Sequence, residues 1–515
     1  MEPRPAVRAA PPERRAGAAR WHLAYVVLAA TFLLVVVQTF RGGTRGGDYW
    51  EHAAVVRELA AHPAQPRHPQ LATDAPHAFF SPYSLALGLL SRATGWSADA
   101  VLGVAAPVNF ALICLGLWLL VRKLTPRPAA PVLTLLCVIF LWGWHPPKWS
   151  SFFHLSDIGH VTAYPSAFAT GLSLIVFGVL VPGRDSVTRG SQFGGAILTL
   201  TWLVPATALL LLAHAPTGTM LMCAGLSVLA VAKCPGPGDF TVARRVALGL
   251  AIPLSLALAC AWPYFPLWRL LRTDQAAFAA ANAELYDPSM AARVTLAFLG
   301  VPVIVARLRA NRRDFLGLLT LGLVAGYVGG LVTNQMSLTR TLPIAVLLLQ
   351  IAAGVWIATW LGTARARRIP RRRLSAVGAA VIAFSLIAQR DAIWFLFPYY
   401  RDQDELLFLQ RHVKADDVVL ADMAASWIIP AYTGKVVAAD HPLAFVPDHD
   451  ARRADVARFY DPATPAADRA ATVRRYNVRF ILARPVNDDA VRVQIEGMGA
   501  IVANQDGVRL VEVHR

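Results

Sequence analysis

Long apolar segments recur through the first three quarters of this 515-residue chain. A helix of about 20 apolar residues crosses the hydrocarbon core of a bilayer. Helices suit that environment because they satisfy all their backbone polar groups internally. We expect spans at 21–40, 97–121, 129–144, 162–182, 194–213, 217–232, 246–268, 291–306, 315–332, 341–361 and 374–388. The pattern predicts a polytopic α-helical membrane protein with about 11 transmembrane helices.

Basic residues gather in alternate connections between these spans. The clusters lie at 122–127, 184–189, 233–245, 307–313 and 365–373. Cytoplasmic loops of membrane proteins carry an excess of Lys and Arg. With the N-terminus inside, every cluster is cytoplasmic, and an odd number of spans places the C-terminus outside the cell membrane. The net charge of +17 thus reflects the basic clusters that fix the orientation of the protein in the membrane. There is no zinc-finger spacing and no long Lys/Arg stripe, so we expect no nucleic-acid partner.

Three regions of the chain differ in composition. Residues 1–20 are rich in Pro, Ala and Arg and are expected to form a disordered cytoplasmic tail, followed by a transmembrane domain over 21–389. Residues 390–515 alternate short apolar runs with helical patterns, which predicts an extracytoplasmic α/β domain without a Gly-rich phosphate loop. Its strands are expected at 418–421, 435–438, 478–483, 500–503 and 508–513, and its helices at 404–413, 452–460 and 465–476.

The first external loop, residues 41–81, is too long for a simple connection, and such loops are usually functional. We expect an amphipathic helix over 51–61 at the membrane surface. A helix that starts near Asp48 places Asp48, Glu51 and His52 on one face, because residues three and four apart are neighbours. Asp48 could serve only as a helix N-cap. Two acids and a histidine together at a membrane surface favour a catalytic role for all three.

This arrangement resembles the membrane glycosyltransferases of the GT-C fold. The matching features are an acid just after the first span, a long first external loop with interfacial helices, about 11 spans and an external C-terminal domain. These enzymes use polyprenyl-phosphate-linked sugars and include protein O-mannosyltransferases, aminoarabinose transferases and oligosaccharyltransferases. In that family the first-loop acid acts on the acceptor or helps to bind a metal, a role that the resemblance assigns to Asp48. Glu51 is not adjacent to Asp48, unlike the paired acids of the mannosyltransferases.

The chemistry of sugar transfer suggests roles for other polar residues. Transfer from a lipid phosphate needs a base that takes a proton from the acceptor hydroxyl, and Asp48 is the candidate. The phosphate leaving group needs a cation that stabilises its charge. Four cations near predicted external membrane boundaries could bind it: Arg45, Lys148, Arg269 and Arg340. Each of them could instead contact lipid headgroups as a snorkelling side chain.

Two further groups could complete the site. Asp74 and His77 lie late in the first loop and could bind substrate, although Asp74 suits turn capping equally well. In the second external loop, His154, Asp157 and His160 recur at spacings of three and could hold a divalent metal such as Mg or Mn. A solvated polar loop is the alternative for these three residues. The sequence indicates no other cofactor.

We therefore expect an inverting membrane glycosyltransferase. It would transfer a sugar from a polyprenyl-phosphate-linked donor to a glycan, lipid or protein acceptor on the extracytoplasmic face. A polytopic transporter or flippase is one alternative, but it would favour charges within the spans and repeated halves. A polymerase or ligase of lipid-linked glycans is another, and it would lack a large external C-terminal domain. A non-catalytic scaffold would leave the cluster around Asp48 unexplained.

Overall fold

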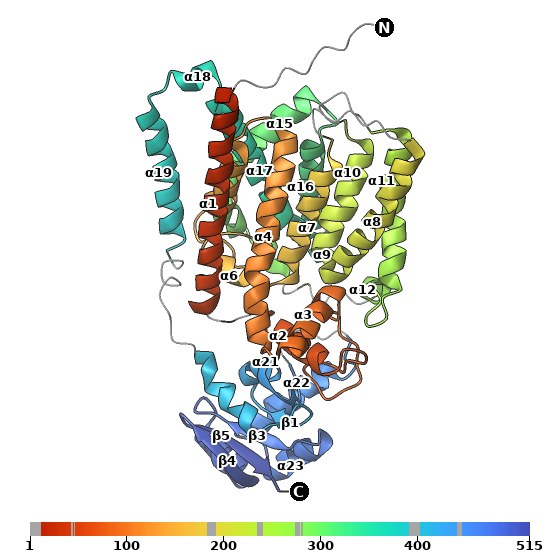
Figure 1. Cartoon of the computed structure of the whole chain (residues 1–515). Coiled ribbons are helices and arrows are strands. Elements are labelled where there is room, and N and C mark those ends of the chain that lie inside the picture. Colours follow the sequence, from red (N-terminus) through yellow and green to blue (C-terminus); the bar gives the residue numbers. More distant parts are fainter. Residues whose placement is uncertain are drawn as a thin grey trace.

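The computed structural model describes most of the chain as a helical bundle with a smaller domain at one end (Figure 1). The smaller domain contains a five-stranded sheet within the described residues, and we call it the sheet domain. Helix α1 (Pro12–Gly42) begins at the opposite end of the bundle and runs toward that domain (Figure 1). We call the end of the bundle that faces the sheet domain the domain end. The described residues are 12–42, 45, 47–182, 192–233, 240–272, 279, 282–390, 402–439 and 445–514.

Long helices of the bundle alternate with short ones. After α1 and the first loop come α4 (Ala98–Leu124), α5 (Ala130–Phe140), α6 (Ile158–Val161), α7 (Pro165–Leu180), α8 (Gln192–Ala213), α9 (Ala215–Thr217), the π-helical η1 (Gly218–Cys223), α10 (Ala224–Val231) and α11 (Val242–Cys260). There follow α12 (Trp268–Arg272), η2 (Glu284–Tyr286), α14 (Ser289–Arg293), η3 (Thr295–Gly300), α15 (Val301–Ala310), α16 (Phe315–Thr333), η4 (Met336–Arg340), α17 (Thr341–Leu361), α18 (Ala364–Arg367) and α19 (Arg371–Ala388).

Six of the described helical segments are long and apolar enough to cross a membrane, as expected for a multi-pass membrane protein. They are Gly17–Arg41, Ala98–Leu124, Ala196–Ala213, Val242–Cys260, Phe315–Thr333 and Met336–Leu361, with shorter apolar segments at Ala130–Phe140, Pro165–Leu180 and Ala215–Val231. The predicted count of 11 spans is therefore not confirmed. The expected span over 217–232 includes η1, and the expected span over 291–306 is divided among α14, η3 and α15. Hydropathy does not reveal such breaks because the backbone pattern changes while the side chains stay apolar.

Small residues let the central helices approach closely, as in other membrane bundles. Helix α4 packs against α7, and a Cβ added at Gly116 or Gly171 would overlap the backbone of the opposite helix. Helices α5 and α17 meet in the same way where Gly354 lies against Thr134. These contacts hold α4, α5, α7 and α17, whose domain ends lead into the loops of the candidate site.

Two helices of the first loop, α2 (Tyr49–Ala61) and α3 (Pro82–Thr94), lie between the bundle and the sheet domain (Figure 1). Helix α2 was predicted to lie at the membrane surface, but ten of its 13 residues are buried. It packs against α3 and α4 and, from the sheet domain, α21 (Met423–Tyr432). The polar side chains of α2 meet protein partners, which periodicity cannot distinguish from water or headgroups, and the position of α2 at the membrane surface stays a prediction. Helix α3 was not predicted.

The sheet domain has the strand order β2-β1-β3-β5-β4. Strands β2, β1 and β3 are parallel, and β5 runs antiparallel to both β3 and β4. Alternate residues of one strand enter different hydrophobic clusters, with Phe480 in one and Ile481 in the other, so both faces of the sheet are covered. The elements are η5 (Asp402–Arg411), β1 (Val418–Leu420), α21, β2 (Lys435–Val436), α22 (His449–Tyr460), α23 (Ala466–Arg475), β3 (Phe480–Ala483), α24 (Asp489–Glu496), β4 (Gly499–Gln505) and β5 (Val508–Val513).

Most of these elements were predicted from the sequence. All five strands lie at the expected positions, and α22 and α23 match two expected helices. The expected α-helix over 404–413 is the 3-10 helix η5. Helices α21 and α24 were not predicted. Residues 391–401, which follow the predicted boundary of the domain at 390, lie outside the described part.

Candidate functional site

Asp48 stands at the start of α2, at the domain end of the bundle. The residue before it, Gly47, has a φ of 54°, a backbone conformation that favours glycine. The backbone carbonyl of Asp48 accepts a hydrogen bond from the His52 amide at 3.0 Å. Its half-buried side chain makes no capping hydrogen bond. The carboxylate is therefore not used as the N-cap acceptor that the alternative interpretation required.

Glu51 and His77 form a buried pair inside the first loop. The Glu51 Oε1 lies 3.0 Å from the His77 Nε2, and the side chains are 2% and 4% exposed. The His77 Nδ1 accepts a hydrogen bond from the Phe79 amide at 3.3 Å. A neutral His77 ring therefore carries its proton on Nε2 and donates it to Glu51. The structure brings these two predicted site residues into contact.

His52 connects the first loop to the bundle. Its buried ring stacks on Phe79, with ring centroids 4.7 Å apart, and lies 5.4 Å from the ring of Tyr164. Tyr164 precedes the first residue of α7, Pro165. Sequence reasoning missed Tyr164 because a residue before a proline at a helix start carries no chemical signal of its own.

The second external loop, residues 145–162, reaches this region from the end of α5. Its short helix α6 packs against the end of α1, and a Cβ added at Gly159 would overlap Thr39 and Phe40. A glycine is therefore needed for this close approach. It brings the second loop beside the end of α1, from which the Asp48 turn departs.

Two carboxylates from different loops act on Tyr164. Burial raises the pKa of the Tyr164 phenol well above its usual 10.0, and the charges of Asp48 and Asp157 raise it further. Tyr164 therefore keeps its proton at neutral pH and can donate a hydrogen bond. Asp48 from the first loop and Asp157 from the second loop thus act on the same residue.

The three predicted metal ligands do not form one group. His154 is fully buried, its Nε2 donates to the Pro147 carbonyl at 2.8 Å, and its Nδ1 accepts from the Ser156 hydroxyl at 2.7 Å. Both ring nitrogens are thereby occupied by protein partners, and the role of His154 as a metal ligand stays a prediction. Asp157 and His160 do lie together, with 3.3 Å between Oδ1 and Nδ1. No set of three ligand side chains occurs among the residues that the structure describes.

Arg340 is a predicted cation on which the charge of Asp48 acts. It ends η4, at the domain end of α17. Its Nε donates to the Asn282 side chain at 2.8 Å, and its Nη1 donates to the Ser150 hydroxyl at 3.3 Å. Its guanidinium lies over the Trp149 ring, 4.8 Å from the centroid. Asp48 is among the charges that act on Arg340.

A histidine outside the predicted set, His214, lies beside these residues. Burial lowers the pKa of His214 to about 3, and the charges of Arg340 and His52 act in the same direction. Its Nδ1 accepts a hydrogen bond from the Thr217 amide at 3.2 Å, which caps α9. The ring therefore stays neutral with its proton on Nε2. A lone histidine at a helix start gives no sequence signal for such a position.

Arg45 is engaged in the protein. Its Nε lies 3.0 Å from the Asp99 Oδ1, and its side chain is 2% exposed. The guanidinium lies over the Phe40 ring at 4.0 Å, and the Tyr49 hydroxyl also donates to Asp99. Its charge is paired at the start of α4, and its predicted contact with a lipid phosphate stays a prediction.

Three other predicted substrate-binding residues lie on the periphery. Lys148 is exposed and lines a pocket of about 370 Å³ together with Arg293. Arg269 is half-buried in α12, with its guanidinium 5.8 Å from the centre of the Trp268 ring. Asp74 is exposed. The part of these residues in substrate binding stays a prediction.

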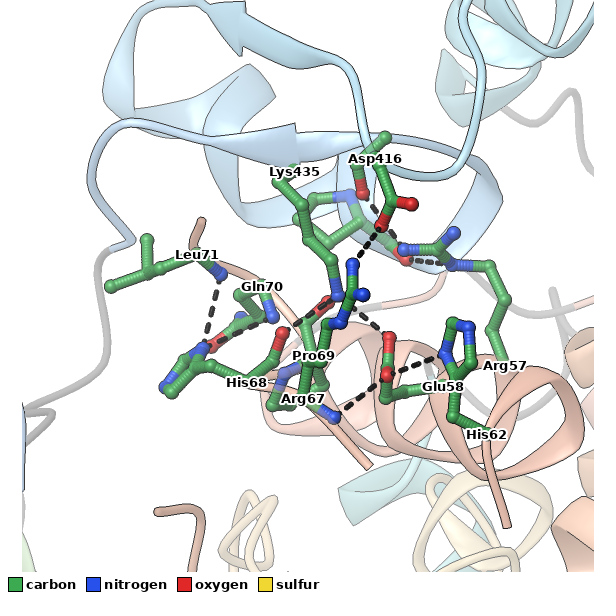
Figure 2. A network of polar contacts seen from close by, with 12 residues as sticks. Arg57, Glu58, His62, Arg67, His68, Pro69, Gln70, Leu71, Asp416 and Lys435 are labelled. Carbon is green, nitrogen blue, oxygen red and sulfur yellow. Dashed lines mark hydrogen bonds and ion pairs between the residues drawn. The ribbon is translucent and has the colours of Figure 1, made fainter. Parts of the chain in front are cut away.

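A buried ion pair joins the first loop to the sheet domain (Figure 2). The Lys435 Nζ lies 2.7 Å from the Glu58 Oε2, and each side chain is 4% exposed. The same Nζ donates to the His68 carbonyl at 2.7 Å. The other Glu58 oxygen accepts from the His62 Nδ1 at 3.0 Å and from the Arg67 amide at 2.9 Å. These extra hydrogen bonds offset the cost of removing both charges from water.

Main-chain contacts extend this junction (Figure 2). Arg57 donates to the carbonyls of Pro430 and Gly434, both at 2.8 Å. Leu71 forms a parallel bridge with Val436, so the first loop continues the sheet beyond β2. Helix α2, which begins at Asp48, is therefore held by the sheet domain along its length.

No protein-family model matches the sequence, and no curated protein matches it either. Several solved structures do match in fold. The oligosaccharyltransferase of Archaeoglobus fulgidus, tethered to an acceptor peptide, has 12% identity and a TM-score of 0.56 over 90% of this chain and 69% of that one. ArnT from Cupriavidus metallidurans has 12% identity and a TM-score of 0.53 over 95% of this chain and 98% of that one.

A third similar structure is the arabinofuranosyltransferase AftD from Mycobacteria. It has 16% identity and a TM-score of 0.53 over 95% of this chain and 40% of that one. All three proteins are GT-C glycosyltransferases. Likeness at such low identity concerns the fold, and it extends over nearly the whole of this chain. The chain therefore has the fold of the GT-C membrane glycosyltransferases, which confirms the resemblance noted in its sequence.

Proposed function

We propose that this protein is an inverting membrane glycosyltransferase. It transfers a sugar from a polyprenyl-phosphate-linked donor to a glycan, lipid or protein acceptor. The fold supports this class, and a structure of the archaeal oligosaccharyltransferase contains dolichol-phosphate, a lipid phosphate of the proposed kind. The single observation that carries the proposal is that the charge of Asp48 acts on both Arg340 and Tyr164 at the domain end of the bundle.

The proposed step forms one bond and breaks one. The acceptor hydroxyl oxygen attacks the anomeric carbon of the donor while Asp48 takes the hydroxyl proton. The bond between that carbon and the phosphate oxygen breaks on the opposite face, which inverts the configuration. Arg340 stabilises the negative charge of the departing polyprenyl phosphate. Its hydrogen bonds to Asn282 and Ser150 hold the guanidinium in place before the reaction.

The other predicted catalytic residues support Asp48 in this proposal. Glu51 is held by His77, and His52 packs on Phe79 and Tyr164, so both fix the first turn of α2. Asp157 and His160 could contribute two ligands to a divalent metal. The residues described do not supply a third ligand in the same group, so we assign no step to a metal.

We place the domain end of the bundle on the extracytoplasmic side of the cell membrane. The distribution of basic clusters supports this orientation. Cysteines introduced at Asp448 and Gln505 should react with a membrane-impermeant reagent outside intact cells, and a cysteine within 1–20 should not. The reverse labelling pattern would overturn the orientation.

The test of the proposed function is the Asp48→Asn variant in proteoliposomes. A panel of polyprenyl-phosphate sugars is supplied together with glycan, lipid and peptide acceptors that carry free hydroxyl groups, and the released polyprenyl phosphate is measured by mass spectrometry. General-base catalysis contributes on the order of a hundred- to ten-thousand-fold in rate, so Asp48→Asn should lose turnover by about that factor. Asn is an equally good N-cap, so a purely capping role predicts almost no change.

Asp488→Asn is the matched control. Asp488 is an exposed N-cap whose side chain accepts a hydrogen bond from the Ala490 amide at 2.8 Å at the start of α24. The same chemical change there should leave turnover at the wild-type level. Near-normal transfer by a folded Asp48→Asn protein would contradict the proposed role of Asp48.

A further inference from the structure

The turn that carries Asp48 is contacted directly by the sheet domain. Trp427 lies on α21, and its indole Nε1 donates to the Gly47 carbonyl at 2.9 Å. This is a contact between residues 380 positions apart. Gly47 immediately precedes Asp48, and its carbonyl belongs to the peptide unit that links the two residues. A shift of that peptide unit therefore moves the Asp48 backbone.

Other contacts hold α21 against α2. The ring of Trp50, a residue that is 3% exposed, has its centroid 5.7 Å from that of Tyr432, the last residue of α21. Arg57, two turns further along α2, donates to the carbonyls of Pro430 and Gly434. The Glu58–Lys435 pair lies next to it on α2 (Figure 2). The sheet domain thus contacts α2 from its first turn to its last.

We infer that Trp427 is a positioning residue for Asp48 and that the sheet domain is thereby part of the catalytic machinery. The inference rests on the proposed function of Asp48. The Gly47 turn has a positive φ and open space where a Cβ would be, so little packing around Gly47 itself fixes it. The hydrogen bond from the Trp427 indole holds the Gly47 carbonyl from outside the loop. Misplacement of a catalytic group by about 1 Å can cost on the order of a hundredfold in rate.

The experiment is a cycle of two variants measured by the same release of polyprenyl phosphate. Trp427→Phe keeps an aromatic ring and removes the N–H donor. It should lower kcat by about five- to tenfold, the usual scale for one lost hydrogen bond, with the KM for the donor unchanged. In the Asp48→Asn background the same change should have no further effect, because a residue that acts through Asp48 has nothing left to position.

The outcomes separate the inference from the proposed function. Full activity of Trp427→Phe, or equal losses from Trp427→Phe with and without Asp48→Asn, would overturn the inference and leave the role of Asp48 intact. A silent Asp48→Asn would overturn the proposed function whatever Trp427→Phe does. If Trp427→Phe does not fold, Trp427→Leu, which also lacks the N–H donor to the Gly47 carbonyl, replaces it in the cycle. The same non-additivity is then expected.

Discussion

The buried pair between Lys435 and Glu58 should dominate the attachment of the sheet domain to the first loop. Replacement of Lys435 by Met removes the cation and leaves the Glu58 carboxylate buried. Removal of one partner of a buried ion pair typically costs about 3–5 kcal/mol. The lower end applies here, because the other Glu58 oxygen keeps its hydrogen bonds from His62 and the Arg67 amide. We expect a loss of about 3 kcal/mol in the free energy of local opening.

Amide hydrogen exchange measures this opening at a defined position. The Val436 amide donates to the Gln70 carbonyl at 2.8 Å across the junction, so it is protected only while the first loop stays on the sheet. A loss of about 3 kcal/mol corresponds to exchange about 150 times faster, since each 1.4 kcal/mol is a factor of ten. Exchange of the peptide that contains Val436 is followed by mass spectrometry of Lys435→Met in detergent or nanodiscs.

Arg67→Met is the matched control for this measurement. Arg67 forms an ion pair with Asp416 across the same junction, but the two side chains are 62% and 65% exposed. Exposed pairs contribute less than about 1 kcal/mol, so Val436 exchange should change by less than about fivefold. Addition of Glu58→Gln to Lys435→Met removes the stranded charge and should restore more than half of the lost protection. Equal and small effects of Lys435→Met and Arg67→Met would refute the reasoning.

Three further predictions concern pH, loop approach and metal. Burial lowers the pKa of His68 well below its usual 6.5, so His68 stays unprotonated in the attached state where the open state binds a proton. The contribution of neutral His68 to attachment is therefore complete above about pH 6.5 and is lost on acidification. Val436 exchange, corrected for intrinsic rates, should then become faster by up to tenfold per pH unit. Unchanged corrected exchange between pH 7 and 5 would contradict this. Gly159→Ala should lower turnover by about tenfold or more because the added methyl group forces the second loop away from α1. The control Gly249→Ala, at a glycine with open space around it, should not lower turnover. Equal activities of the two variants would refute the role of the close approach at Gly159. If Asp157 and His160 bind a metal, a chelator should abolish sugar transfer, and Asp157→Asn should raise the metal concentration that transfer requires. Full activity in the presence of the chelator would exclude metal binding by these two residues.

The sequence was sufficient to predict a membrane bundle followed by a small sheet domain, because hydropathy and turn chemistry are local properties. The apolar spans predicted a membrane bundle, and the alternation after residue 390 predicted the five strands that form the sheet. The elements that were missed are those whose stability depends on partners. Helix α21 contains Pro430 and faces α2 rather than a solvent boundary, so no local pattern marks it. The segments η1 and η3, where the expected spans are broken, also pack against neighbouring helices.

For the candidate site, local sequence marked Asp48 as a candidate because an acid after a glycine pair at the end of a span is a visible pattern. Charge type alone could not tell Arg45, which pairs with Asp99, from Arg340, on which the charge of Asp48 acts. It also could not show that His154 points into the core or that Tyr164, His214 and Trp427 lie near the first turn of α2. Those assignments depend on which residues from distant parts of the chain become neighbours, and only the packing of two loops and the sheet domain against the bundle decides that.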